Sequence, residues 1–272
     1  SNNSIVDEGP WVDDSLLRKY VAGQVTAQGT FYYYNRSNNQ VVAPYTTVYL
    51  YDQDPGGNDD PLATTTTNAN GFFVFPSMEN WDYDDPNDPD RHLDLYVVWE
   101  TDYHDSGMAE HRVENFSDQA YKWTSFVWTN APDGTISFSS YLPPGFYDLE
   151  AMWIFQDLRN AWEYIYNNTS QHFDPGSVTV LWENDENSRP PCQGSCFYGF
   201  GPYVFIADND TISADVVIHE TGHHYMYNAT GWWMWWDISC YAHSLFSQED
   251  VYCAWSEGWA DFFPLAANRD PC

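Results

Sequence analysis

The chain of 272 residues is long enough for two modest domains. It carries 40 acidic and 9 basic residues, a formal net charge of −31 at pH 7. Such a surface repels phosphate groups, so the composition excludes nucleic acid as a partner. No apolar run reaches the ~18 residues of a membrane-spanning helix, so no transmembrane segment is predicted.

Three explanations of the acidity remain open from composition alone. The surface is adapted to high salt, or it works in acid where many carboxylates are protonated, or it holds several calcium ions.

Residues 1–14 are polar and lack periodicity, so they are expected to form a flexible arm or a strand that pairs with another molecule. The sequence starts at Ser1 with neither an initiator Met nor a signal-peptide pattern, which is expected of a secreted protein after processing. Several Asn-x-Ser/Thr sequons add to the expectation of an extracellular location, because they are acceptors for glycosylation. The alternative is that they occur by chance in an Asn- and Thr-rich chain. The glycosylation candidates are Asn35, Asn115, Asn167, Asn209 and Asn228, and further sequons begin at Asn2 and Asn168.

Strand patterns dominate residues 15–140. Val48 and Leu50 alternate with tyrosines, which is the period of a half-buried strand, and residues 68–71 (NANG) predict a tight turn. Short strands at this spacing predict an antiparallel β-sandwich. The stretch TTTTNANGFFVF resembles the prealbumin-like sandwich modules that accompany secreted peptidases and surface proteins. That resemblance implies a spacer or a binding unit.

An acidic stretch in this module predicts a calcium-binding loop, because oxygen ligands at short spacing suit a hard cation. The spacing differs from an EF-hand, and the alternative is a solvated acidic turn. The candidate ligands are Asp82, Asp84, Asp85, Asn87, Asp88 and Asp90. A second acidic loop, with Asp52, Asp54, Asp59 and Asp60, is a candidate to contribute.

Residues 141–145 (YLPPG) are expected to join two domains. Residues 146–169 carry apolar side chains at helical spacing, and residues 177–182 and 201–208 have strand patterns. The polar insert between them is expected to overhang a cleft.

The stretch HETGH has the form H-E-x-x-H. Residues four apart lie on one face of a helix, so His219 and His223 can share one zinc ion. Glu220 sits where it can take a proton from a zinc-activated water. Thr211 or Ser213 is expected to cap the start of the helix.

A second motif, SEGWADFF, offers the third protein ligand that an open catalytic zinc site needs. Glu257 can supply it from another helix, and Asp261 can accept a hydrogen bond from the outer nitrogen of a ligand histidine.

Together the two motifs resemble the gluzincin metallopeptidases, the thermolysin-like branch of the zincins. The resemblance covers residues from about Phe146 onward. It implies that His219, His223 and Glu257 bind zinc, that Glu220 is the catalytic base, and that Asp261 orients a histidine. It also implies a protein or peptide substrate. An edge strand before the metal helix, residues 203–207 or 178–182, would pair with the extended substrate.

Two parts of the gluzincin apparatus stay open. The oxyanion donor has five candidates, namely Tyr225, Tyr227, Tyr241, His243 and Tyr252, while His224 is expected in packing. Few residues follow Glu257, whereas thermolysin-like enzymes continue into a helical lobe. The lobe here is minimal, was cleaved off, or is completed by another molecule.

Five cysteines all follow residue 190. In an oxidising compartment the simple interpretation is two disulfides, Cys192–Cys196 and Cys240–Cys253. The remaining Cys272 is a candidate for self-assembly between chains, as is the N-terminal arm.

The sequence therefore predicts an α+β protein with an N-terminal arm (1–14), an antiparallel β-sandwich (15–140) and a minimal zincin-like metallopeptidase lobe (141–272). The expected function is a secreted zinc endopeptidase. The alternative is a non-catalytic extracellular assembly protein that uses the zincin fold as a scaffold, stabilised by calcium and disulfides.

Overall fold

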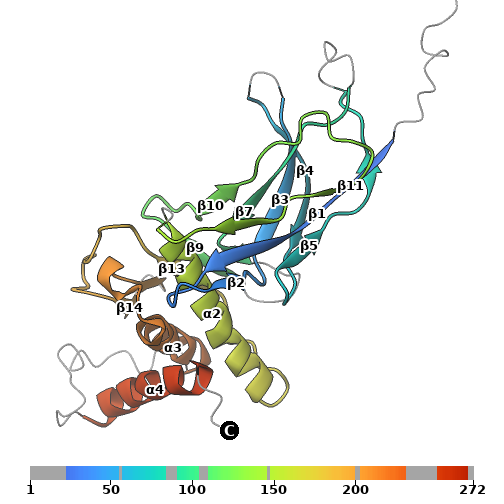
Figure 1. The fold of residues 1–272 in the computed structure, drawn as a ribbon. Helices are drawn as coiled ribbons and strands as arrows, with labels where there is room; N and C mark the ends of the chain where they lie inside the picture. The colour runs from blue at the N-terminus through green and yellow to red at the C-terminus, as the bar shows by residue number, and fades with distance from the viewer. Residues whose placement is uncertain are drawn as a thin grey trace, which may run out of the picture.

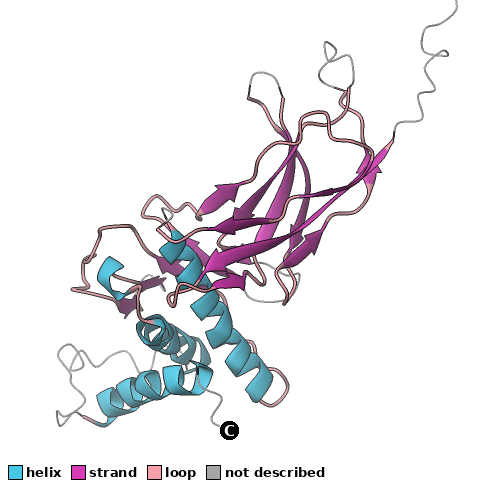
Figure 2. Cartoon of the chain, viewed as in Figure 1, coloured by secondary structure: helices cyan, strands magenta, loops and turns pink. Residues whose placement is uncertain are grey.

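The protein has a β-rich part and a helical part that pack against each other (Figures 1 and 2). The computed structural model describes residues 23–54, 57–83, 91–103, 110–145, 148–199, 203–230 and 250–268. Mostly antiparallel sheets make up the N-terminal part, and three α-helices follow among the described residues. The predicted α+β class is confirmed.

The first sheet is built around one long strand, β1 (Gln24–Tyr34). Alternate residues of β1, such as Val25, Ala27 and Phe31, are buried, as expected for a strand with one face on the core. Antiparallel partners of β1 are β2 (Gln40–Val42), β5 (Phe72–Val74) and β6 (Met78–Glu79). Its parallel partners are β11 (Gly134–Ser137) and β12 (Ser140–Leu142).

A second, fully antiparallel sheet packs on the first. Its strands lie in the order β10 (Lys122–Thr124), β7 (Leu95–Glu100), β3 (Thr47–Asp52) and β4 (Asp60–Thr66). Phe31 of the first sheet stacks on Trp99 of the second with ring centroids 4.5 Å apart, and both side chains are buried. The predicted turn at residues 68–71 is present, and Gly71 adopts a left-handed φ of 67°.

The third sheet draws strands from both sides of the predicted boundary near residue 140. Its order is β14 (Cys196–Tyr198), β15 (Tyr203–Phe205), β13 (Val178–Leu181), β9 (His111–Glu114) and β8 (Asp102–Tyr103). β13 pairs in parallel with both β9 and β15. The β-rich part and the helical part therefore share one sheet. The domain limits themselves stay a prediction, and residues 1–14 lie outside the described residues.

Three helices form the layer that carries the site. They are α2 (Leu149–Asn168), α3 (Ala214–Thr230) and α4 (Val251–Asn268), and a short 3-10 turn, η1 (Asp208–Asp210), precedes α3. α2 buries apolar residues at helical spacing, among them Leu149, Met152 and Phe155, and it contacts α3, α4 and β9. Within the described residues, none of these helices combines the length and apolarity required to span a membrane.

One arginine ties the end of β1 to the helical layer. The guanidinium of Arg36 pairs with both carboxylate oxygens of Asp157 on α2 and donates from Nε to the Thr211 carbonyl oxygen (2.7 Å). Because Thr211 lies just before α3, a single side chain links the sandwich to two helices.

Candidate metal centre

α3 places the two histidines of the HETGH motif on one face. Their Nε2 atoms lie 3.2 Å apart. Ser213 directly precedes the helix, and its hydroxyl accepts a hydrogen bond from the Val216 N–H (3.4 Å), which is one of the two caps that the sequence predicts.

Glu257 on α4 completes a triangle of donor atoms. Its Oε2 lies 3.5 Å from Nε2 of His219 and 3.4 Å from Nε2 of His223. Tetrahedral zinc with bonds of about 2.1 Å separates its ligand atoms by ~3.4 Å. The spacing of these three atoms therefore fits one zinc ion. Two imidazole nitrogens and a carboxylate oxygen are also ligand types that zinc accepts.

The outer nitrogens of both rings have partners of their own. Nδ1 of His219 lies 3.2 Å from Oδ1 of Asp261, and Nδ1 of His223 lies 3.2 Å from the hydroxyl oxygen of Ser256. Such partners hold each ring with Nε2 toward the metal position. The role of Asp261 follows from its spacing in the sequence, whereas Ser256 was missed because a serine beside the ligand Glu carries no motif.

Charges around His219 favour its protonated form in the metal-free protein. Burial alone lowers its pKa, but the hydrogen bond to Glu257 and the charges of Glu220, Glu257 and Asp261 raise it overall. The carboxylates of Glu220, Glu257 and Asp261 thus favour a positive charge at this position.

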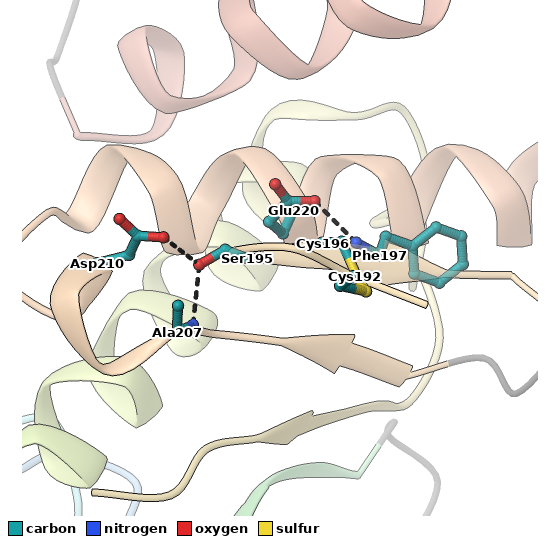
Figure 3. The surroundings of a disulfide bond; sticks show 7 residues. All are labelled: Cys192, Ser195, Cys196, Phe197, Ala207, Asp210 and Glu220. Carbon is teal, nitrogen blue, oxygen red and sulfur yellow. Dashed lines mark hydrogen bonds between the residues drawn. A yellow bond between two sulfur atoms is a disulfide. The ribbon is translucent and has the colours of Figure 1, made fainter. Parts of the chain in front are cut away.

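Glu220 is held beside this triangle by the backbone of β14. Its Oε2 accepts a hydrogen bond from the Phe197 N–H at 2.8 Å (Figure 3). Desolvation raises the pKa of Glu220, although the histidines and this hydrogen bond oppose the shift.

β14 is one of the two edge strands of the third sheet, with β15 as its sheet partner. The resemblance implied residues 203–207 or 178–182 for this place, and that expectation is wrong, because β15 and β13 are both interior strands. The edge comes from the polar insert, whose three-residue strand has too short a pattern to recognise. The predicted Cys192–Cys196 disulfide closes the loop just before Phe197 (Figure 3).

α3 and α4 approach each other closely at a glycine. A Cβ atom added to Gly222 would lie 3.0 Å from Cδ1 of Phe263, and the indole N–H of Trp259 donates to the Gly222 carbonyl oxygen (3.1 Å). The glycine inside the HETGH motif therefore lets the two ligand-bearing helices meet.

The candidate oxyanion donors differ in their burial and in their contacts. Tyr225 is 2% exposed and packs against Phe263, and burial raises its pKa. His224 is buried as expected, with Nε2 2.7 Å from the Ser177 carbonyl oxygen. Tyr252 is exposed near the start of α4. Tyr241 and His243 lie outside the described residues.

Three aspartates from the two acidic loops come together on the sandwich. Asp52, Asp54 and Asp82 each offer an oxygen within 4.8 Å of the others. Oδ1 of Asp52 accepts from the Asp94 N–H (2.6 Å), and burial raises the pKa of Asp52 to about 7. The other candidate calcium ligands, Asp84, Asp85, Asn87, Asp88 and Asp90, lie outside the described residues.

The remaining cysteines and sequons are placed in part. Cys253 is disulfide-bonded, but Cys240 and Cys272 lie outside the described residues, so the Cys240–Cys253 pairing stays a prediction. Nδ2 of Asn228 donates to the Pro175 carbonyl oxygen (2.9 Å), which engages the atom that glycosylation would modify. Asn167 and Asn209 are exposed, whereas Asn35 and Asn115 accept backbone hydrogen bonds within their own turns.

Comparisons with known proteins bear mainly on the helical part. Residues 151–272 match the family described as "Mycolysin C-terminal domain". No match was found among the curated proteins.

Two solved structures resemble the chain only weakly. One is a 9R-lipoxygenase from Cyanothece PCC8801, with 14% identity, a TM-score of 0.27, and coverage of 52% of this chain and 23% of that one. The other is a proposed carbohydrate binding protein from Pseudomonas aeruginosa, with 14% identity, a TM-score of 0.23, and coverage of 49% of this chain and 98% of that one. At TM-scores this low, neither structure indicates the fold or the function of this chain. The family match supports a zincin-related context, and the part of the chain that holds the donor triangle is similar to a peptidase-associated domain.

Proposed function

We propose that the protein is a secreted, zinc-dependent endopeptidase. The observation that carries this proposal is the triangle of two imidazole nitrogens and one carboxylate oxygen, with sides of 3.2 to 3.5 Å, beside a glutamate held at its edge. A purely structural zinc site closes with four protein ligands and has no use for such a base.

His219, His223 and Glu257 would hold the zinc ion, and Asp261 and Ser256 would keep the two rings oriented toward it. Zinc in this position supplies Lewis-acid polarisation of a peptide carbonyl and makes water more acidic. Glu220 takes the proton from the attacking water and returns it to the leaving amine.

The substrate we propose is an extended peptide. β14 contacts α3 and lies at an edge of the third sheet, so backbone groups on its outer side, apart from the Phe197 N–H that bonds Glu220, are proposed to pair with an added strand. Pairing of this kind recognises main chain more than side chains, which suits a broad endopeptidase.

Replacement of Glu220 tests the proposal. We expect Glu220→Gln to bind zinc like the wild type but to hydrolyse casein about 100-fold more slowly or worse, because an amide cannot take the proton. Hydrolysis and metal content are measured on the same preparations, with a chelator and with zinc restored. Ser188→Ala, an exposed change in the polar insert, serves as the control.

An unchanged rate in Glu220→Gln would show that another group is the base. Wild type that is fully loaded with zinc yet cleaves neither casein nor a panel of unrelated peptides would contradict the proposal and favour the assembly alternative.

A further inference from the structure

The backbone N–H that restrains Glu220 belongs to a strand with little stability of its own. β14 has three residues, lies at a sheet edge, and comes from a polar insert. Such short edge segments open readily unless other contacts hold them. The position of the Phe197 N–H therefore depends on what anchors β14.

Ser195 supplies one anchor from the residue before β14. Its hydroxyl donates to Oδ2 of Asp210 (2.6 Å) and accepts from the Ala207 N–H (3.0 Å), as Figure 3 shows. The first bond is charge-assisted and short, which places it among the stronger hydrogen bonds. Ala207 is 2% exposed, so its N–H has little access to water as a replacement partner.

The other end of this anchor is the start of the metal helix. Asp210 ends η1, and its carbonyl oxygen accepts from the Ser213 N–H (2.9 Å) directly before α3 begins. The Cys192–Cys196 disulfide is a second anchor, because it joins the two ends of the short loop that contains Ser195. Ser195 and Cys196 are adjacent, so both anchors act immediately before Phe197.

We propose that Ser195 is a positioning residue for Glu220. Its hydrogen bond to Asp210, together with the Cys192–Cys196 disulfide, fixes the position of β14 relative to α3. The Phe197 N–H then restrains one carboxylate oxygen of Glu220 and leaves the other for the attacking water. This inference rests on the proposed endopeptidase function. A base displaced by about 1 Å can lose on the order of 100-fold in rate, so an anchor outside the reacting groups can matter as much as a ligand.

The test compares Ser195→Ala with Ser195→Thr, which keeps the hydroxyl, and with Ser188→Ala as the control. We expect Ser195→Ala to lower kcat about 10- to 100-fold at unchanged zinc content, with Ser195→Thr restoring most of it. In the Glu220→Gln background, Ser195→Ala should have no further effect on the residual rate, because the group that it positions is already lost. An ordinary structural serine would instead give additive losses.

Hydrogen exchange of the Phe197 amide gives a readout that needs no activity. Exchange should be slow in the wild type and Ser188→Ala, and faster by about 10-fold or more in Ser195→Ala and in Glu220→Ala. Cys192→Ser/Cys196→Ser should behave like Ser195→Ala, which provides a second variant if Ser195→Ala does not fold.

The two proposals fail in distinguishable ways. An inactive but zinc-loaded wild type would contradict the endopeptidase, and the exchange data would still decide whether Ser195 holds the Phe197–Glu220 contact. An active wild type, with Ser195→Ala and the cysteine double variant equal to it in kcat and in Phe197 exchange, would overturn the positioning role alone.

Discussion

Arg36 shows how one residue can set the stability of the joint between sandwich and helices. Its partner Asp157 is 5% exposed, and burial raises the pKa of that carboxyl to about 6 although Arg36 opposes the shift. The folded pKa lies above the unfolded one near 4, so the native state binds the proton more tightly. The cost of ionising Asp157 is therefore absent below about pH 4 and fully present above about pH 6.

Arg36→Ala should destabilise the protein more at neutral than at acidic pH. At pH 7 it leaves a buried carboxylate without its bidentate partner, at a cost of about 3–5 kcal/mol. At pH 4 Asp157 is protonated, so only neutral hydrogen bonds and packing are lost. Urea unfolding at the two pH values measures the difference. Arg36→Ala/Asp157→Asn is the control, because it should lose this pH dependence, and equal losses for Arg36→Ala at both pH values would argue against the assignment.

At the scale of elements, the geometry of the donor triangle depends on how α3 meets α4. The helices carry different ligands, so a shift of one against the other moves Glu257 relative to both histidines. A Cβ atom added to Gly222 would lie 3.0 Å from Cδ1 of Phe263, so the phenyl ring would have to shift to admit it. Gly258, next to Glu257, has open space around its Cβ position.

Gly222→Ala should weaken zinc binding by about 10-fold or more, the size of effect seen when groups that orient metal ligands are changed. Gly258→Ala makes the same chemical change one residue from a ligand without a clash, and it should leave zinc affinity unchanged while adding up to ~1 kcal/mol of helix stability. Competition with a chromophoric chelator measures both affinities. Equal affinities in the two variants would show that close helix packing does not set the site.

The helices and the donor residues could be predicted from the sequence because their signals are local. His219 and His223 lie one turn apart on a helix that Ser213 caps, and α2 shows its apolar stripe within twenty residues. Glu257 required only a second motif at a recognisable spacing.

The parts that the sequence did not reveal depend on contacts between distant residues. The parallel pairing of β9 with β13 joins segments about 67 residues apart, and no local sequence pattern predicts it. β14 has three residues, so its place at the edge is set by β15 and α3. The contacts of Ser195 with Asp210, and of Phe197 with Glu220, follow from that placement.

For the whole molecule, a formal charge of −31 must be accommodated in a compact fold. Burial raises the pKa of Asp52 to about 7, with Asp82, Asp54 and Asp94 adding to the shift. Asp52, Asp54 and Asp82 each offer an oxygen within 4.8 Å of the others, so ionisation of Asp52 costs free energy that a bound cation would offset. We propose calcium as that cation.

Calcium at micromolar to millimolar concentration should raise the melting temperature, through binding to the folded state alone. Asp52→Asn should abolish most of that shift, whereas Asp60→Asn, an exposed change of the same charge in the same loop, should retain it. Melting curves are compared in calcium and in sodium chloride of matched ionic strength. Equal shifts in the two salts would support salt adaptation and contradict a specific calcium site.

Anomalous diffraction at the zinc absorption edge tests the central claim most directly. Crystals of protein loaded with one equivalent of zinc should show a single strong peak about 2.1 Å from Nε2 of His219, Nε2 of His223 and an oxygen of Glu257. The peak should be absent from His223→Ala crystals treated in the same way. No peak inside the triangle, or a zinc ion held by other residues while these three side chains point apart, would contradict the account.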